Sequence, residues 1–100
     1  MKVFVYGTLL QGESNHRLLA DAECLGEWAM PPRFTLYDIG PYPILCTHGQ
    51  QSVTGEVYRI NGAILARLDE LEDYPTHYDR DRIVTPWGPA WFYFQRQRPA

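Results

Sequence analysis

One acidic side chain, Glu72, lies where the hydrophobic pattern predicts a buried position. The sequence predicts a helix over residues 63–73. Its apolar residues recur at helical spacing and share one face: Ile64, Leu65, Leu68 and Leu71. Glu72 follows Leu68 by four residues and points the same way, whereas Glu70 points away and Asp69 lies near the boundary of the apolar stripe. A carboxylate aimed at an apolar interior is costly as an anion, so it needs a partner, a wet cleft or a proton.

Two interpretations of Glu72 are open on this pattern. Burial raises the pKa of a carboxyl group, and a glutamate that titrates nearer neutrality can act as a general base and then return the proton as an acid. In the alternative interpretation, Glu72 lies at the last turn, near the helix edge, and forms a structural ion pair with Arg80 or Arg82. The periodicity does not choose between the two.

The segment that follows the first predicted strand could bind an anion. Gly7 has no Cβ, so the backbone of Tyr6-Gly7-Thr8-Leu9 can turn sharply and present consecutive N–H groups to one point. Such a group of donors suits a carboxylate or a developing oxyanion. The alternative is a simple turn at the end of a strand. The chain has neither the GxxxxGK[ST] nor the GxGxxG spacing of nucleotide-binding loops.

The other reactive residue types do not form a recognisable site. Cys24 and Cys46 have no CxxC spacing, which excludes a disulfide framework and a four-ligand zinc site and predicts free, mostly buried thiols. Cys46 and His48 could form a metal pair or a nucleophile with its base, but the spacing offers no third ligand or orienting acid. A buried thiol beside an exposed loop histidine is expected instead. Ser14 and Ser52 lack the GxSxG context of a nucleophilic serine.

Short strands and two short helices are expected to position these residues. Strands are predicted where β-branched and aromatic residues alternate or cluster, at residues 2–6, 25–30, 33–39, 53–60, 78–85 and 90–94, with a short edge segment at 44–46. Ser14 is expected to cap a helix that ends near Asp21, and Asn61 to cap the helix over residues 63–73. Turns are predicted at residues 40–43, 48–51 and 86–89. Without strict βαβ alternation, this order predicts an α+β fold, a small mixed β-barrel or curled sheet with two short helices.

The aromatic residues of the last predicted strand and its turn alternate poorly: Trp87, Trp91, Phe92, Tyr93 and Phe94. This pattern fits a core strand buried on both faces or a strand whose outer face meets a partner. The chain is therefore expected to be a monomer or a homodimer.

Composition limits the class of protein. The chain has 100 residues, 45% of them hydrophobic, and a formal net charge of −3, which predicts a single acidic globular domain over residues 1–100. It has no basic stripe, so nucleic acid is not expected as a partner. No apolar stretch approaches the ~20 residues that a membrane-spanning helix needs. A strand pattern instead of a signal peptide follows Met1, so a cytoplasmic protein without membrane contact is expected.

Several segments have a recognisable combination of residues when they are taken in chain order. They are Val3-Phe4-Val5-Tyr6-Gly7-Thr8-Leu9, then Gly12, Asn15-His16, Leu18 and Leu25-Gly26, then Gly55-Glu56-Val57-Tyr58, and finally Leu68-Asp69-Glu70-Leu71-Glu72-Asp73-Tyr74-Pro75 with Tyr78. Together, these segments resemble the γ-glutamylcyclotransferase-like family over most of the chain. The short length and the Gly-x-x-Asn-His stretch are most similar to the γ-glutamylamine cyclotransferase branch and its small bacterial relatives.

The resemblance implies a compact mixed α/β barrel whose cavity holds a small-molecule γ-glutamyl substrate. It implies that Tyr6-Gly7-Thr8-Leu9 binds the substrate, that Tyr78 lines the cavity and that Glu72 is the catalytic acid and base. The implied reaction is attack of the γ-glutamyl α-amine on its own γ-amide carbonyl, which releases 5-oxoproline and an amine or amino acid. It implies no metal or organic cofactor. The alternative function is a non-catalytic module that binds a γ-glutamyl or other small carboxylated ligand.

Overall fold

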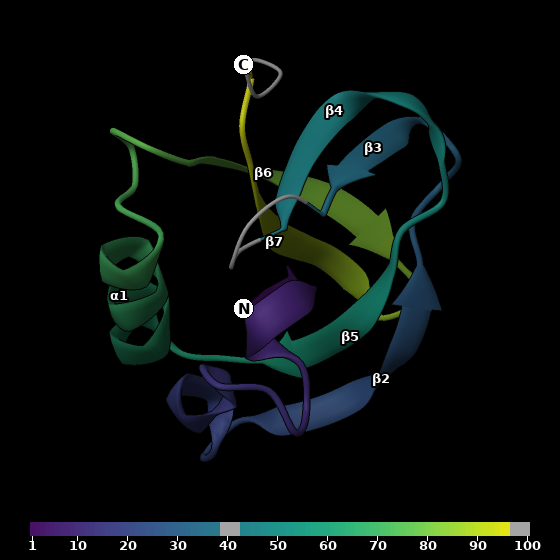
Figure 1. Cartoon of the computed structure of the whole chain (residues 1–100). Coiled ribbons are helices and arrows are strands. Elements are labelled where there is room, and N and C mark those ends of the chain that lie inside the picture. Colours follow the sequence, from purple (N-terminus) through teal and green to yellow (C-terminus); the bar gives the residue numbers. More distant parts are fainter. Residues whose placement is uncertain (39–42, 97–100) are drawn as a thin grey trace.

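The computed structural model describes residues 1–38 and 43–96, in which strands are interrupted by short helices (Figure 1). The strands are β1 (Lys2–Val5), β2 (Glu23–Ala29), β3 (Phe34–Tyr37), β4 (Ile44–Gln51), β5 (Thr54–Arg59), β6 (Asp79–Thr85) and β7 (Gly88–Phe94). The helices are two 3-10 segments, η1 (Gly7–Leu9) and η2 (His16–Leu19), and the α-helix α1 (Gly62–Leu71). The predicted turn at residues 40–43 lies outside the described residues except at its last position.

The strands form a mixed sheet and a separate hairpin. Within the described residues, five strands share one sheet in the order β2-β5-β1-β7-β6, and β3 pairs with β4 in a second sheet. Strand β1 runs antiparallel to β5 and parallel to β7. The predicted α+β class is therefore confirmed. The large sheet is not closed into a barrel, because β2 and β6 remain its two edges, so the barrel form of the prediction is wrong.

The large sheet has apolar side chains on both of its faces. The alternation of side chains along β1 directs Val3 and Val5 into one buried cluster and Phe4 into another. Strand β7 contributes in the same way, with Tyr93 in the first cluster and Phe92 in the second. This confirms that the aromatic strand is part of the core.

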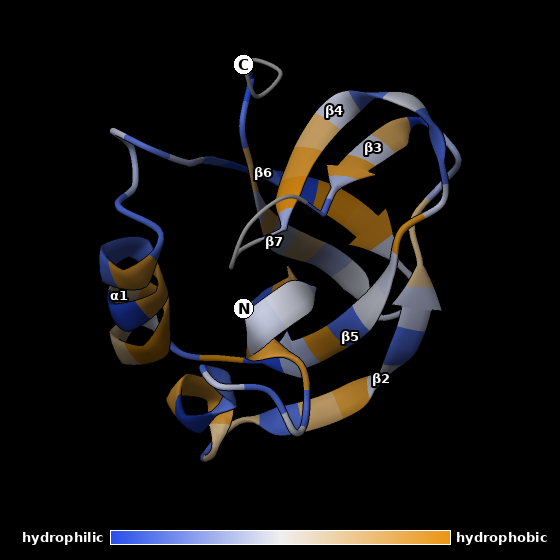
Figure 2. Cartoon of the chain, viewed as in Figure 1, coloured by the Kyte–Doolittle hydropathy of each residue, from blue (hydrophilic) through white to orange (hydrophobic). Residues whose placement is uncertain are grey.

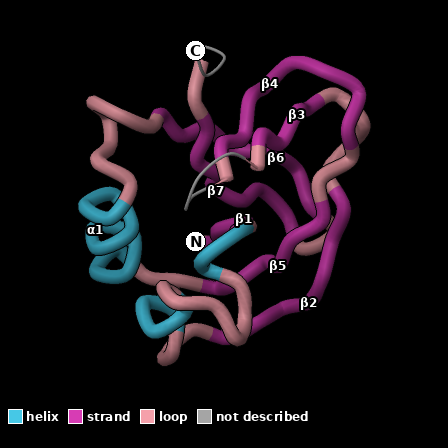
Figure 3. Tube along the Cα trace, viewed as in Figure 1, coloured by secondary structure: helices cyan, strands magenta, loops and turns pink. Residues whose placement is uncertain are grey.

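Helix α1 begins where its cap was predicted. The Asn61 Oδ1 atom accepts a hydrogen bond from the Ile64 N–H at 2.9 Å, and Ile64 and Leu68 are buried in the first cluster. Leu71 was predicted on the same buried face but is 38% exposed and lies outside this cluster. Helix α1 and the 3-10 helix η2 lie at the left of the view, whereas η1 lies near its centre beside β1 (Figure 3). No helix in the described part of the chain is long and apolar enough to span a membrane.

Two local predictions are wrong. The polar residues 48–51 form the second half of β4 and not a turn, because β4 pairs with β3 as far as the Phe34–Gln51 position. Figure 2 shows this change along β4 from apolar to polar residues. The segment from Ser14 to Asp21 forms only the short 3-10 helix η2, and neither Ser14 nor Asn15 caps it. The Asn15 side chain instead donates a hydrogen bond to Thr8.

Candidate active site

The C-terminal end of α1 positions Glu72. The Glu72 N–H donates to the Leu68 carbonyl at 2.9 Å, so Glu72 continues the helical path one residue beyond α1. Asp73 then adopts a φ of 52°, a left-handed conformation that turns the chain away from the helix axis. The chain folds back at once, because the His77 N–H donates to the Asp73 carbonyl at 2.7 Å, and the next residue, Tyr78, is buried.

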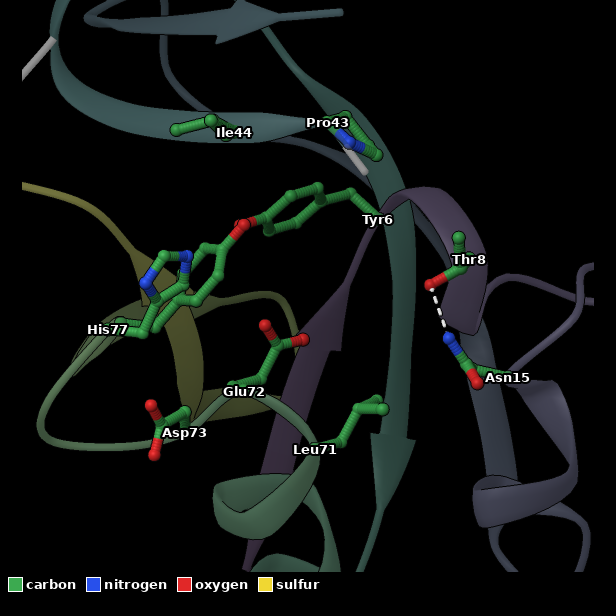
Figure 4. A pocket seen from close by; sticks show the side chains of 10 residues that line it. Tyr6, Thr8, Asn15, Pro43, Ile44, Leu71, Glu72, Asp73 and His77 are labelled. Carbon is green, nitrogen blue, oxygen red and sulfur yellow. Dashed lines mark hydrogen bonds between the residues drawn. The ribbon is translucent and has the colours of Figure 1, made fainter. Parts of the chain in front are cut away.

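The end of β1 forms a second wall. Gly7 has a φ of 68°, and a Cβ atom at this position would lie 2.6 Å from Pro43 Cγ, so a glycine is needed for this close approach. Beyond Gly7, the Asn15 amide donates to Thr8 Oγ1 at 3.0 Å and ties the loop to the segment before η2. The Tyr6 side chain extends across the space between the two walls (Figure 4).

These elements surround a cavity of about 400 Å³, a volume typical of small-molecule sites. The residues that line it come from the ends of β1, β4 and α1 and from the loops beside them: Tyr6, Thr8, Asn15, Pro43, Ile44, Leu71, Glu72, Asp73, His77 and Tyr78. Figure 4 shows the Glu72 carboxylate and the Tyr6 ring facing the same space. The cavity therefore combines an apolar wall with a carboxylate and several hydrogen-bonding groups.

The Glu72 carboxylate is partly desolvated, and it forms no ion pair within the part of the chain that the structure describes. Among the described residues, no arginine, lysine or histidine forms an ion pair with it. Burial raises the pKa of Glu72 to about 7. Burial, together with the nearby Glu72 charge, also raises the pKa of Tyr6, and the same two causes raise the pKa of Tyr78 to about 12. Glu72 therefore changes charge near neutral pH, where these two phenols stay protonated.

The arginine that could have neutralised Glu72 is bound to another carboxylate. The Arg80 Nη2 atom donates to Asp69 Oδ2 at 3.3 Å, and Arg80 Nε lies 2.9 Å from Asp69 Oδ1. The Arg82 guanidinium lies over the Trp91 ring, 5.1 Å from its centroid. The interpretation of Glu72 as the partner of Arg80 or Arg82 is therefore wrong.

Comparison with known sequences assigns the family. The sequence profile of "Gamma-glutamyl cyclotransferase, AIG2-like" matches residues 3–100. The chain belongs to this family. A relative from Vibrio cholerae, provisionally named a gamma-glutamylcyclotransferase, is 52% identical over 95 residues, which cover 95% of this chain and 82% of that protein.

Two further relatives place this family member among proteins of similar length and fold. The gamma-glutamylcyclotransferase family protein YtfP from Escherichia coli is 41% identical over 99 residues, covering 99% of this chain and 85% of that protein. The crystal structure of the uncharacterized protein PH0828 from Pyrococcus horikoshii superposes with a TM-score of 0.87 at 28% identity, covering 100% of this chain and 81% of that chain.

In this gamma-glutamyl cyclotransferase family member, the residues predicted to bind substrate occupy different places. Tyr6, Thr8 and Tyr78 line the cavity together with the glutamate. Gly7 is not part of the lining but allows the turn that carries Thr8 there. Leu9 is 3% exposed and packs in the first core cluster, so its side chain supports the loop from behind.

Sequence reasoning missed part of the cavity wall. Asn15 belongs to the Gly-x-x-Asn-His stretch that carried the resemblance, and its distance from Thr8 in the chain gave no sign of a direct contact. His77 adjoins Tyr78 and could have been considered for that reason. No sequence signal indicated Pro43 or Ile44, because only the packing of β4 brings them to this site.

The cysteine and histidine pair is not part of this cavity. Cys46 is buried, as predicted, whereas Cys24 is exposed, and the two form no disulfide. His48 lies half-buried on strand β4 and not in an exposed loop. Within residues 1–38 and 43–96, no three histidine, cysteine, aspartate or glutamate side chains are grouped so that they could hold a metal ion.

Proposed function

We propose that this chain is a γ-glutamyl cyclotransferase in which Glu72 is the acid–base residue. The α-amine nitrogen of a γ-glutamyl group forms a bond to the γ-carbonyl carbon, and the bond from that carbon to the amide nitrogen breaks. The products are 5-oxoproline and the amine or amino acid that was held in the amide. Glu72 takes protons from the α-ammonium group and passes them to the leaving nitrogen, so the reaction consumes no external proton.

The observation that carries this proposal is the half-buried Glu72 carboxyl group that lines the cavity and whose pKa of about 7 lies near neutral pH. A general base must be ionised to accept a proton, and a general acid must be protonated to donate one. A group with a pKa near the working pH can do both in one turnover. An ion-paired glutamate would remain ionised and would be a poor acid.

The cavity wall supports the remaining tasks of such an enzyme. Nucleophile and electrophile belong to the same substrate, so the main requirement is a folded, near-attack conformation, for which effective molarities can be very large. Tyr6, Thr8 and Tyr78 offer hydroxyl groups that could fix that conformation. The backbone N–H groups of the Tyr6-Gly7-Thr8-Leu9 loop would bind either the substrate α-carboxylate or the developing oxyanion.

The test is product release from a panel of substrates. Purified protein is incubated with γ-glutamyl-amines and γ-glutamyl-amino acids, and 5-oxoproline and the free amine are quantified by mass spectrometry. Release of both products in equal amounts would support the reaction and would identify the preferred leaving group. If a folded protein binds members of the panel, as seen by thermal shift, and releases no product, the function is ligand binding and not catalysis.

The Glu72→Gln variant tests the assigned residue. Loss of a general acid–base group commonly costs 10²–10⁴-fold in rate, so turnover is expected to fall within this range while the fold is kept. The matched control is Glu70→Gln, which removes an exposed carboxylate two residues away on the same helix. Turnover of Glu72→Gln within a few-fold of the wild type would contradict the role of Glu72.

A further inference from the structure

A cluster of polar and aromatic residues lies beside the proposed acid–base glutamate and takes no part in the reaction proposed above. We call it the arginine cluster, and its members are Asp69, Tyr74, Arg80, Trp91 and Tyr93. The side chains of Arg80 and Asp69 are only 15% and 23% exposed, so both charges are largely removed from water. Such a pair is costly to assemble and even more costly to break, because removal of one partner leaves the other charge buried.

The position of the Arg80 guanidinium is fixed from three sides. Its central carbon lies 4.4 Å from the centroid of the Tyr74 ring and 4.3 Å from that of Trp91. The planar group is thus held by two aromatic rings and directed at Asp69. The Nε contact with Asp69 is electrostatic because it lacks hydrogen-bond alignment, whereas Nη2 donates a hydrogen bond.

Hydrogen bonds connect this cluster to the cavity. The Tyr93 hydroxyl donates to Asp69 Oδ1 at 2.7 Å, and the Tyr6 hydroxyl donates to the Tyr93 carbonyl at 2.6 Å. Asp69 therefore accepts hydrogen bonds from a tyrosine and from an arginine at the same time. The Tyr6 ring belongs to both structures, since it lines the cavity and is bonded to β7.

The spacing along α1 makes Asp69 and Glu72 competitors for the same cation. Residues three apart on a helix lie side by side, with Cβ atoms roughly 5–6 Å apart. Glu72 continues the helical path, so this spacing applies to it. An arginine within about 4–6 Å of a carboxylate lowers its pKa by about 1–3 units. Glu72 could not then serve as both base and acid near neutral pH.

We propose that Asp69 is a positioning residue that binds the Arg80 guanidinium and the Tyr93 hydroxyl, and thereby keeps this cation from pairing with the Glu72 carboxylate. The importance of this for turnover depends on the function proposed above. The effect of Asp69 on the pKa of Glu72 does not depend on that function.

Other ionisable groups near Glu72 also contribute to the electrostatic environment of its carboxyl group. The phenols of Tyr6, Tyr78 and Tyr93 face it from the end of β1, from the segment before β6 and from β7. Cys46 of β4 lies close to the first two of these phenols. Asp73 and His77 line the same cavity from the loop after α1. Arg80 of β6 is the cation whose release is tested.

The experiment measures the pKa of the Glu72 carboxyl group by NMR, which requires no turnover. Asp69→Asn keeps the size of the side chain but removes the charge that holds Arg80, so the pKa of Glu72 is expected to fall by about one unit or more. The double variant Asp69→Asn/Arg80→Met removes the cation as well, and the pKa is expected to return toward the wild-type value. The control Glu70→Gln should shift it by no more than a few tenths.

The same variants give a kinetic readout if the proposed reaction occurs. The acidic limb of the plot of kcat against pH should move to lower pH in Asp69→Asn and return in the double variant. An unchanged Glu72 pKa in a folded Asp69→Asn protein, or equal shifts in the single and double variants, would overturn the proposal. Wild-type protein that releases no 5-oxoproline would contradict the proposed function alone, since the NMR titration would still test Asp69.

If Asp69→Asn does not fold, Arg80→Lys provides the second test. A lysine keeps the positive charge but loses the planar group that stacks on the two rings and the fork that fits Asp69. Its flexible ammonium group should reach Glu72 and lower the pKa of that carboxyl group. An unchanged pKa of Glu72 in a folded Arg80→Lys protein would overturn the proposal.

Discussion

The arginine cluster and the cavity treat two neighbouring carboxylates in opposite ways. In the arginine cluster, Asp69 forms an ion pair with a guanidinium group and accepts a hydrogen bond from a tyrosine hydroxyl. In the cavity, Glu72 has no such partner among the described residues, and burial raises its pKa to about 7. Stability requires the first arrangement, and acid–base chemistry requires the second. The comparison teaches that a cation paired with one carboxylate leaves a neighbouring, half-buried carboxylate without an ion pair among the described residues and with a raised pKa.

The largest effect on stability is expected when the ion pair between Arg80 and Asp69 is broken. Arg80→Met leaves Asp69 largely buried without its cation and should lower the free energy of unfolding by about 2–4 kcal/mol, measured by urea denaturation. The matched control is Arg82→Met, since Arg82 is exposed and contacts one ring of the cluster, and it should cost less than about 1 kcal/mol. Equal losses of unfolding free energy in the two variants would show that the ion pair adds no stability beyond the contact with the ring.

Removal of the Glu72 charge should change the free energy of unfolding in the opposite direction, because this carboxylate has no cation to lose among the described residues. The pKa of Glu72 is about 7 in the folded state and 4.5 for the unperturbed group, so its contribution to stability is fully present below pH 4.5 and is lost as the pH rises to about 7. Glu72→Gln removes this loss and should stabilise the protein by about 2 kcal/mol at pH 8, after allowance for partial exposure, and by almost nothing at pH 4. Urea denaturation at both pH values gives the result. A destabilised variant at pH 8 would mean that the ionised glutamate is compensated after all.

A smaller effect is expected at the loop that faces Glu72. Gly7→Ala forces a side chain into a left-handed conformation and against Pro43, which should cost about 1–2 kcal/mol and raise KM. Gly12→Ala is the control, because Gly12 also has a positive φ, 84°, but a Cβ there meets no atom within 4 Å. The difference between the two variants in thermal unfolding isolates the contact with Pro43. If both variants lose the same stability, the close approach at Gly7 does not matter.

The smallest effect concerns the hydrogen bond that joins the two regions. Tyr6→Phe removes the donor to the Tyr93 carbonyl and should lower the free energy of unfolding by about 1 kcal/mol, measured by urea denaturation. The aromatic ring remains, so the cavity keeps its shape. A variant as stable as the wild type would indicate that water replaces the hydroxyl group and that the two regions are not coupled through this bond.

Most of the local structure around the site could be predicted from the sequence. The Asn61 cap, the buried positions Ile64 and Leu68, and the buried strand β7 follow from residues only a few positions apart. The failed turn prediction at residues 48–51 has a physical cause. Residues 48–51 look like a turn because they are polar, but they belong to β4, whose last residue, Gln51, pairs with Phe34 of β3. Tertiary pairing overrides local propensity in such segments.

The candidate site could be predicted in part, as far as it depends on local periodicity and on the family resemblance. The helical period showed that Glu72 faces inward, and the resemblance added Tyr6, Thr8 and Tyr78, all of which line the cavity. The sequence did not show that Leu9 lies in the core whereas Thr8 lines the cavity. The two residues are neighbours in one motif and have similar sequence signals.

The sequence by itself determined the family, the inward position of Glu72 and the presence of several charged groups near it in the chain. These depend on residue identity and on the geometry of a single helix. Only the tertiary structure decided that Arg80 binds Asp69 and not Glu72, because that choice depends on how β6 and β7 pack against the end of α1. A helix with two carboxylates three residues apart offers either one to a cation. The fold selects one of them, and the other remains available for chemistry.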